Sequence, residues 1–339
     1  MDLGRYIARR LGLAVFVLLG VLLITFIISH SFGDPIYAWL GKSAALHPAL
    51  VKLYEEKFHL NAPIWVQFYY YVLGLAQGNL GVSPSRGFTP VSIVIEQTLP
   101  YTLQIAFFAI ILTLLMGFVF GIIASFYHRK PADAGIRAFY LGGYSSPPFF
   151  IGLLLLIVFV YYAHWLPSGG AASIYVATPH PITGIPMIDS LIEGNFAYFW
   201  SAIDHVILPS LTLAVTTFGV VTRILRSSVL DVMHSNFIRT ARAKGADERS
   251  VFLYHGLQNA LIPVVTVSSL VVTYLLTGTV FVETIFGYPG MGQYVVQALL
   301  AQDYPGILAT TLIFAMLIVL TNLVADILYV VVDPQIRYS

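Results

Sequence analysis

Long runs of apolar residues constrain this 339-residue chain more than any other feature of its sequence. A bilayer hydrocarbon core about 30 Å thick is crossed by roughly 20 apolar helical residues, because each backbone group must find its hydrogen-bond partner within the helix. The runs that meet this requirement are, approximately, Leu11–Ser29, Leu99–Tyr127, Phe149–His164, Val206–Val221, Leu261–Phe281 and Ile307–Val332. The sequence therefore predicts an all-α polytopic membrane protein with six transmembrane helices.

The composition agrees with this prediction. Charged residues make up only 10% of the chain, against about a quarter in soluble domains. A balance of 17 basic and 16 acidic residues excludes a nucleic-acid surface. The first apolar run exceeds the h-region of a signal peptide, so we expect it to remain as a span in the cell (plasma or inner) membrane, in contact with the lipid bilayer.

The basic residues lie unevenly between the spans, which predicts the orientation of the chain. Of the 17 lysines and arginines, 13 fall on one side if six helices cross the bilayer. These 13 are Arg5, Arg9, Arg10, Arg129, Lys130, Arg137, Arg223, Arg226, Arg239, Arg242, Lys244, Arg249 and Arg337. Both the N- and the C-terminus are therefore expected to be cytoplasmic.

The spans divide the chain into four parts. Residues 1–10 form a cytoplasmic N-terminus, 11–31 the first transmembrane helix, 32–98 an extracytoplasmic insertion, and 99–339 a five-helix core. Within the insertion, Val51–Phe58 and Trp65–Leu75 are expected to be short helices separated by a break at Asn61–Pro63. The aromatic cluster at Trp65–Tyr71 is interpreted either as an interfacial belt or as packing inside the insertion.

The segment after the fourth span is predicted to form a helix–glycine–helix elbow. The span's helix is expected to reach about His234, and Ser235 or Asn236 then caps a short helix over 237–244. Gly245 supplies the left-handed residue that ends it, and Asp247 caps the next helix. Pro263 is expected in the first turn of the fifth span. A topology signal needs charge but not this capped geometry, so we interpret the elbow as a docking site for a soluble partner.

Sites for catalysis, metal or nucleotide are not apparent in the sequence. Gly41–Lys42–Ser43 matches the end of a phosphate-binding loop, but Ile36 stands where that loop needs a glycine. The histidines are scattered without metal-ligand spacing. Asp326 is the ionisable residue closest to a mid-membrane position, and we interpret it as a snorkelling or an interhelical polar contact rather than an ion relay. We therefore expect a protein that is not an enzyme and that binds no metal or cofactor of its own.

Small and hydroxyl-bearing residues within the spans allow two interpretations. Gly117 and Gly121 form a G-x-x-x-G pair that permits close helix approach. Threonines of the fourth and fifth spans offer hydroxyls to a polar translocation path, or else bond the carbonyls of their own helices. The path candidates are Thr212, Thr216, Thr273 and Thr277.

The elbow sequence over 237–265 resembles the EAA loop of binding-protein-dependent ABC importer permeases, in the version found in dipeptide and oligopeptide permeases. Further segments of the chain resemble that family in the same order. They are the N-terminal YIARRLG, Gly33–Pro35, Gly78–Ser83, Leu99–Leu103, Ser145–Phe149, Glu283–Gln293 and the tail from Asp326 to Arg337. This sequence differs from the EAA pattern at two positions. Arg239 stands in place of the leading glutamate of the loop, and Gln258 stands in place of its terminal proline.

The resemblance implies a type I ABC importer permease fold and a non-catalytic subunit of an ATP-driven importer. The implied partners are a second, homologous permease, two ATP-binding cassette subunits that carry ATP and Mg, and an extracytoplasmic substrate-binding protein. The coupling loop lies at about 235–262, and the residues implied to meet an ATPase subunit are Phe237, Arg239, Ala241, Lys244, Gly245 and Asp247. The implied solutes are di- and oligopeptides, with oligosaccharides or a nickel chelate as alternatives. A stand-alone ion-coupled carrier or channel is the alternative from another class.

Overall fold

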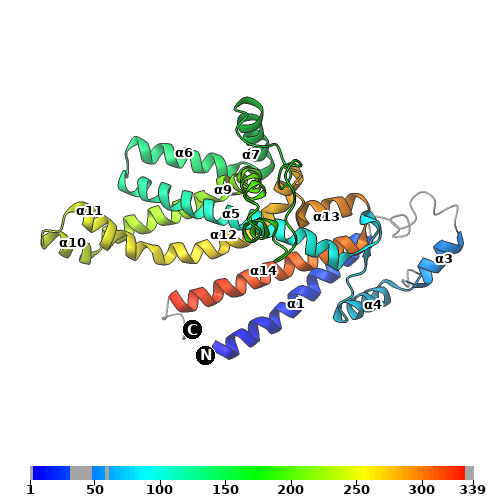
Figure 1. Ribbon diagram of the computed structural model, residues 1–339. Helices are drawn as coiled ribbons and strands as arrows, with labels where there is room; N and C mark the ends of the chain where they lie inside the picture. Colours follow the sequence, from blue (N-terminus) through cyan, green and yellow to red (C-terminus); the bar gives the residue numbers. More distant parts are fainter. Residues whose placement is uncertain (1–2, 31–47, 58–60, 333–339) are drawn as a thin grey trace.

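The computed structural model describes residues 3–30, 48–57 and 61–332, almost all of which are helical or in the turns between helices. The long helices lie side by side along one direction, and α10 and α13 lie toward opposite ends of the bundle (Figure 1). The predicted features at Gly33–Pro35, at Gly41–Ser43 and in the tail 333–339 lie outside the described residues.

Within the described residues, five helices are long and apolar enough to cross a membrane, and the number is six if a bent helix pair counts as one span. The five are α1 (Leu3–His30), α5 (Val91–Phe126), α9 (Phe196–Met233), α12 (Gln258–Ile285) and α14 (Tyr304–Val332). They match five of the six predicted spans, and each begins before the apolar run that predicted it. The prediction of a six-span all-α fold is confirmed, with a difference in the third span.

The third span is a bent pair rather than the single helix predicted at Phe149–His164. Helix α6 (Pro131–Ser145) meets α7 (Pro148–Leu155), which continues as the π-helical η3 (Leu156–Tyr162), at an angle of 112°. Pro147 and Pro148 lack the N–H groups that would continue the α6 hydrogen-bond ladder. Arg137, expected in a loop, therefore lies within α6.

Shorter elements connect the spans. They are α3 (Pro48–Lys57), α4 (Ile64–Ala76), β1 (Val82–Ser83), η2 (Pro84–Arg86), β2 (Thr89–Pro90), α8 (Pro186–Ile192), α10 (Asn236–Ala243), α11 (Glu248–Ser250), the π-helical η4 (Val251–Leu257) and α13 (Met291–Leu300). The two strands form an antiparallel hairpin in which Val82 pairs with Pro90. The carboxylate of Asp303 accepts hydrogen bonds from the Ser83 and Ser85 hydroxyls, which fixes this hairpin to the start of α14.

The core of the bundle is the contact between α5 and α9, which small residues bring close together. A Cβ atom at Gly117 would lie 2.6 Å from Val221, and one at Gly121 would lie 2.8 Å from Leu225. The Thr113 and Thr217 hydroxyls meet across the same contact at 3.0 Å. The expected close approach at the G-x-x-x-G pair is thus confirmed, and its partner is α9. In the 18-residue apolar part of α9, 72% of the residues are buried inside the protein. The least apolar of the five long helices is therefore the central one.

Helix α1 joins the bundle mainly along α14. Arg10 near the start of α1 forms an ion pair with Asp326 near the end of α14, with an Nη1–Oδ2 distance of 2.9 Å. At the other end of α1, Phe26 stacks edge-on against Phe68 of α4 with ring centroids 5.4 Å apart. The interpretation of Asp326 as an interhelical contact is confirmed.

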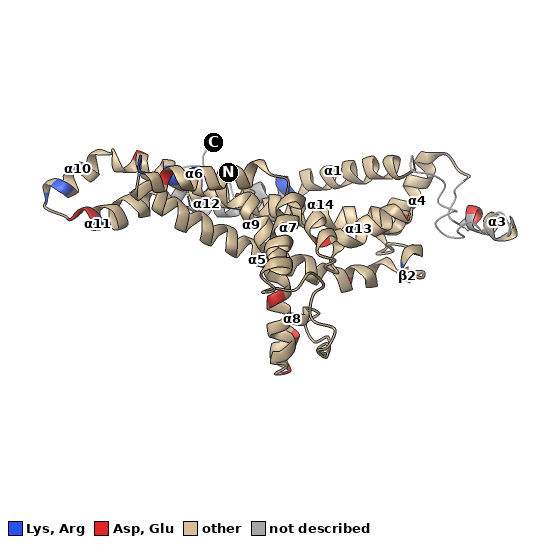
Figure 2. Cartoon of the chain, turned by 90° about the horizontal axis from the view of Figure 1, so that it is seen from above, with Lys and Arg blue, Asp and Glu red and all other residues tan. Residues whose placement is uncertain are grey.

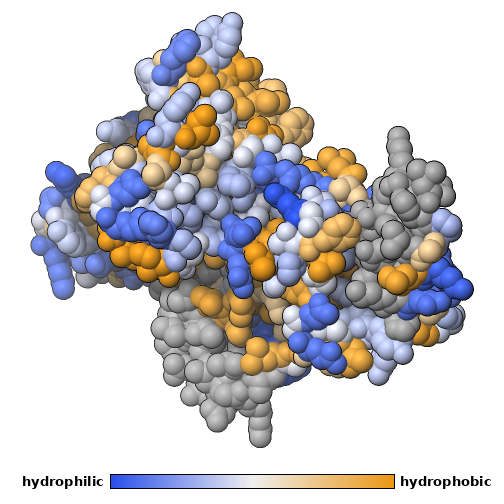
Figure 3. All heavy atoms as spheres, turned by 45° about the vertical axis from the view of Figure 1, so that its right-hand side comes forward, coloured by the Kyte–Doolittle hydropathy of each residue, from blue (hydrophilic) through white to orange (hydrophobic). Residues whose placement is uncertain are grey.

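The outside of the bundle is apolar over wide areas. Hydrophobic side chains form several separate exposed areas on the face shown in Figure 3. Phe16 of α1, Phe107 of α5 and Leu320 of α14 are among the large side chains that are more than half exposed. Side chains of this kind are suited to contact with lipid.

Candidate functional site

The elbow protrudes from one end of the bundle between α9 and α12 (Figure 1). Helix α9 ends at Met233, as predicted to within a residue, and α10 follows over Asn236–Ala243. Charged residues mark α10 and α11 at this end (Figure 2). The predicted short helix thus exists, and both of its flanks continue directly into membrane-spanning helices.

The turn after α10 has the predicted geometry. Gly245 adopts φ +84°, a left-handed conformation that glycine reaches without steric cost. The Asp247 carboxylate accepts the Ser250 N–H at 3.0 Å and caps α11. Hydrogen bonds from Ser250 to the carboxylate also hold the pKa of Asp247 below its usual value. The two residues together set the direction in which the chain leaves α10.

The predicted cap at the start of α10 is only half correct. Ser235 occupies the N-cap position with an extended backbone, but its side chain makes no capping hydrogen bond. The Ser235 hydroxyl is buried and has no hydrogen-bond partner among the described residues. Asn236 is already the first helical residue, so the prediction that it could be the cap is wrong.

Side chains facing inward fasten α10 to the rest of the bundle. Ile238 is completely buried, as is Val251 of η4, and Phe252 is 6% exposed. The Phe252 ring meets the ring of Phe126 at the end of α5, with centroids 5.2 Å apart. A Cβ atom at Gly256 would lie 2.8 Å from the Met233 sulfur, so this glycine lets η4 approach the end of α9. The burial of Ile238 thus fixes α10, and the Phe252 and Gly256 contacts hold η4, which leads into α12, against α5 and α9.

The outward face of α10 carries three of the residues assigned to coupling. Phe237, Ala241 and Lys244 are spaced four and three residues apart and share one face of the helix. Phe237 is 47% exposed, and Lys244 is exposed as well. This face presents an exposed aromatic side chain and an exposed cation, with the partly buried Ala241 beside them.

Arg239 is exposed but lies roughly half a turn from Phe237, so it projects away from that face. Beside the turn, Arg242 forms a bidentate pair with Glu248, with distances of 2.7 and 3.1 Å. Both side chains are well exposed, so the pair orients the elbow more than it stabilises the fold.

The helix that contains the fifth span begins earlier than predicted, although the membrane-crossing part itself begins at Pro263. Helical structure runs without a break from Glu248 through η4 and α12 to Ile285. Pro263 begins the apolar span, as predicted, but it lies inside the longer helix α12 and not at a helix start. The π-helical turns of η4 lie just before the proline, and a wider local helix accommodates a missing backbone donor. The elbow is thereby joined to α12 as one continuous rod.

The four threonines assigned to a translocation path do not share one surface. Thr212 and Thr216 are buried, and their hydroxyls donate to carbonyls of Leu208 and Leu213 in α9. Thr273 donates to the Asn322 side chain of α14 at 3.0 Å. Thr277 is exposed and bonds the Thr273 carbonyl in its own helix. Their role in a path stays a prediction, and Thr277 alone of the four is exposed.

A buried ion pair near the elbow has no motif in the sequence that predicts it. Asp133 of α6 is 1% exposed and accepts two hydrogen bonds of 2.8 Å from Arg226 of α9. The Arg129 N–H donates to the same carboxylate at 3.1 Å, and Arg137 lies 3.5 Å from it. The sole sequence signal is an acidic residue in a basic segment. The pair holds the α5–α6 turn against α9.

Glu283 is a second residue that the sequence pattern does not reveal, because the apolar run of the fifth span stops just before it. It is completely buried in α12, and its Oε2 accepts the Gln293 N–H at 3.0 Å. A Cβ atom at Gly290 or Gly292 would collide with this carboxylate. Glu283 therefore organises the turn between α12 and α13.

Residues 117–338 match the family model described as binding-protein-dependent transport system inner membrane component. The chain is 39% identical to a probable D,D-dipeptide transport system permease protein of Escherichia coli K12, over 95% of this chain and 94% of that protein. It is 35% identical to the dipeptide transport system permease protein of the same strain, over 99% of both chains. An oligopeptide transport system permease protein of Bacillus subtilis is 36% identical over 99% of this chain and 100% of its own length.

The fold has a counterpart among solved structures. The crystal structure of an amino acid ABC transporter with histidines aligns with 70% of this chain and 94% of its own chain, with a TM-score of 0.52 and 13% identity. At this identity the likeness concerns the fold alone. The match to the family model and the relatives above 30% identity are more specific, and they show that the chain belongs to the family of binding-protein-dependent transport system inner membrane components.

Proposed function

We propose that the chain is the membrane-spanning permease subunit of an ATP-driven, binding-protein-dependent importer of di- and oligopeptides. The peptide assignment is supported by the relatives, which are dipeptide and oligopeptide permeases aligned over nearly their whole length. The observation that carries the coupling role is the outward face of α10, held on a buried Ile238 between two membrane helices.

In this proposal α10 sits in a cleft of an ATP-binding cassette subunit on the cytoplasmic side, and both termini are cytoplasmic. A second, homologous permease completes the translocation path, and a second ATPase subunit binds its elbow. When ATP closes the two soluble subunits, their clefts draw the two elbows together. Because α10 is fastened to α9 and α12, the movement shifts the bundle from an inward-facing to an outward-facing arrangement.

The chain's own residues transmit this movement and perform no chemistry. ATP and Mg are bound by the partner subunits, and peptide is delivered by an extracytoplasmic binding protein. The segment 32–98 is our candidate for part of the contact with that protein. The 112° bend of the α6–α7 pair and the Asp133–Arg226 ion pair keep the third span attached to α9 as α9 moves.

Two substitutions test the docking face. Ala241→Glu places a larger, charged side chain on that face, and Gly245→Pro blocks the left-handed turn because proline fixes φ near −65°. Both are expected to abolish peptide uptake in proteoliposomes that contain the partner subunits, while membrane insertion is retained. Ala243→Glu is the comparison variant, because Ala243 is exposed in the same helix and shares a face with Arg239 instead of Phe237. Retained uptake in this variant would place docking on the Phe237 face, and lost uptake would place it on the Arg239 face.

Normal uptake by both test variants would refute docking through α10. The substrate class is tested separately by competition: excess unlabelled dipeptide is expected to suppress uptake, and an oligosaccharide or a nickel chelate is not. Transport that needs neither ATPase subunits nor binding protein would support the stand-alone carrier instead.

A further inference from the structure

Helix α12 presents a continuous exposed stripe that mixes hydroxyl-bearing and large apolar side chains. The α12 stripe consists of Leu270, Tyr274, Thr277, Phe281 and Thr284, all of which are exposed. Their spacing of four and three residues places them on one side of the helix. Leu270, Tyr274 and Phe281 are between 55% and 60% exposed. The stripe runs from the middle of the span to its end at the α13 side.

The other long helices expose a different kind of surface. Over residues 99–126 of α5 the exposed positions are all apolar, and they are Leu103, Phe107, Ile111, Leu115, Val119 and Phe126. The exposed Glu96 and Gln97 lie nearer the start of that helix. The exposed positions of α14 are Met316, Leu320 and Val324. Surfaces of this composition are suited to lipid, which offers no hydrogen-bond partner. Among the described spans that consist of a single helix, α12 alone exposes hydroxyl groups on a stripe that reaches mid-span. In the bent α6–α7 pair, Tyr144 and Ser145 are exposed next to the bend.

Tyr274 differs most from the apolar surfaces of α5 and α14, because it lies deep within the membrane span. It lies at the middle of the 263–285 span, roughly 16 Å from either end at a rise of about 1.5 Å per residue. Its phenol has no hydrogen-bond partner among the described residues. Tyrosine facing lipid is found at the membrane interfaces, where its hydroxyl reaches water, and not at the bilayer centre. An exposed phenol at this depth needs water, protein or solute beside it.

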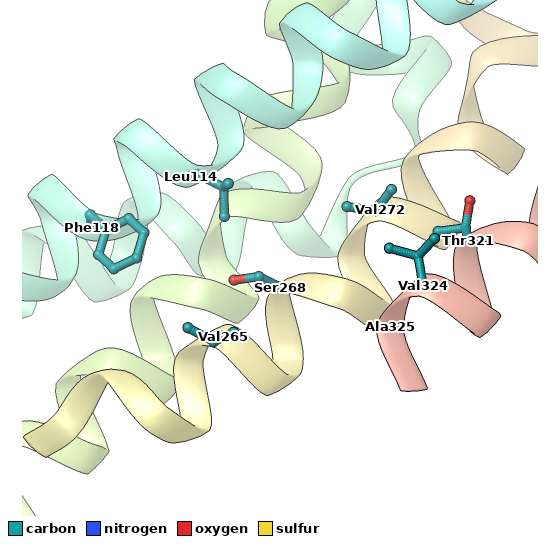
Figure 4. A pocket seen from close by; sticks show the side chains of 8 residues that line it. All are labelled: Leu114, Phe118, Val265, Ser268, Val272, Thr321, Val324 and Ala325. Carbon is teal, nitrogen blue, oxygen red and sulfur yellow. The ribbon is translucent and has the colours of Figure 1, made fainter. Parts of the chain in front are cut away.

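The opposite face of α12 is already occupied by this chain. Val265, Ser268 and Val272 line a cavity of about 320 Å³ together with Leu114 and Phe118 of α5 and with residues of α14 (Figure 4). These α12 positions lie roughly half a turn from the stripe. The Ser268 hydroxyl is satisfied by the Val264 carbonyl at 2.7 Å. The stripe therefore faces away from the chain's own α5 and α14.

The side chains of the stripe also differ from those of a close helix interface. Helices pack tightly in membranes through small residues, as Gly117 and Gly121 of α5 do against α9. The α12 stripe instead carries leucine, tyrosine and phenylalanine among its threonines. Hydroxyls suit the backbone amides of a peptide, and the large apolar groups suit its variable side chains.

We propose that the α12 stripe lines the translocation path and contacts the peptide as it passes, with the Tyr274 hydroxyl as a hydrogen-bonding group at mid-membrane depth. The proposal rests on the proposed importer function and narrows the predicted path to one face of one helix. It retains Thr277 from the predicted set because that residue is exposed, and it sets aside Thr212, Thr216 and Thr273, which are not. The Thr277 and Thr284 hydroxyls donate to carbonyls of α12, so they face the path as hydrogen-bond acceptors.

The chain contains no cysteine, so single introduced cysteines report water access without background on this subunit. Tyr274→Cys, Thr277→Cys and Thr284→Cys are prepared in the complex with its partner subunits and treated with a charged methanethiosulfonate reagent. Phe107→Cys and Ile111→Cys of α5 are the matched controls. Because the thiolate reacts and forms poorly in an apolar environment, we expect the α12 cysteines to be modified about tenfold faster or more.

Modification should also change rate between the nucleotide-free complex and one trapped with ATP, because the path opens to opposite sides in the two states. Equal, slow modification of the α12 and α5 cysteines in both states would overturn the proposal. Copurification of the partner subunits shows that each variant assembles. Fast modification in a complex that does not transport dipeptide would support the path and refute the peptide assignment of the proposed function.

A conservative substitution tests the contact with solute. Tyr274→Phe removes one hydroxyl and keeps the ring, and loss of one hydrogen bond is expected to raise the KM for dipeptide uptake about two- to tenfold. The ATPase rate without peptide should not change, since the residue touches neither the elbow nor its anchors. Tyr274→Phe with an unchanged KM would refute the hydrogen-bonding role.

Discussion

Gly142 and Gly143 are adjacent glycines of α6. Replacing each by alanine has the same effect on helix propensity, so a difference in stability between the two variants reports on helix packing. A Cβ atom at Gly143 would lie well inside van der Waals contact with the Val215 carbonyl oxygen of α9, whereas one at Gly142 meets nothing within 4 Å. Replacing glycine by alanine in a helix gains about 1 kcal/mol from propensity. Overpacking costs about 1–3 kcal/mol, and a backbone oxygen cannot turn away as a side chain can.

Gly142→Ala is therefore expected to stabilise the protein slightly, and Gly143→Ala to destabilise it. Because the propensity gain is common to both variants, their difference in free energy of unfolding isolates the packing cost, about 3 kcal/mol at the upper end of the overpacking range. Unfolding by sodium dodecyl sulfate in mixed micelles, followed by circular dichroism, measures this difference. Gly143→Ala at least as stable as Gly142→Ala would refute the packing of α6 on α9, and with it the bent third span.

Two further predictions concern ionised side chains. Asp133→Asn leaves the buried Arg226 without its counter-charge, which typically lowers the free energy of unfolding by about 3–5 kcal/mol. Arg137→Gln, at a side chain that is 47% exposed, should lower it by less than about 1 kcal/mol. Equal losses in the same unfolding assay would contradict the ion pair. Burial raises the pKa of Asp189, but hydrogen bonds from the Thr183 hydroxyl and N–H outweigh it and leave the pKa lowered. Its stabilisation is therefore present above the unfolded value of about 3.9 and is lost as pH falls through the folded pKa. The cost of Asp189→Asn should shrink below about pH 4, and a cost independent of pH would contradict this assignment.

Local signals in the sequence predict much of this fold, because they act through neighbouring residues. Five long apolar runs lie within long helices, and Gly245 and Asp247 form the expected turn and cap. These features depend on the bilayer thickness, on the conformational freedom of glycine and on a carboxylate near free N–H groups. None of them needs a distant part of the chain.

The remaining features depend on contacts between distant segments, which no local pattern records. Helix α6 has little apolar character of its own, and its position follows from the contact of Gly143 with α9 and from the Asp133–Arg226 pair. The continuity of helix across Pro263 depends on the π-helical turns of η4. Among the four threonines predicted to line a path, Thr277 is exposed and the other three are not. This difference depends on which faces of α9 and α12 pack against other helices.

The ion pair between Arg10 and Asp326 has a consequence for how the protein is made. The two residues are 316 positions apart, so at about 5–20 residues per second the carboxylate is synthesised about 15–60 s after the arginine. Helix α1 is translated before the other described long helices, yet α14, the long helix it packs along, follows all of them. The α1–α14 contact therefore closes only after the intervening helices have been made, so α1 must wait in the membrane without this partner.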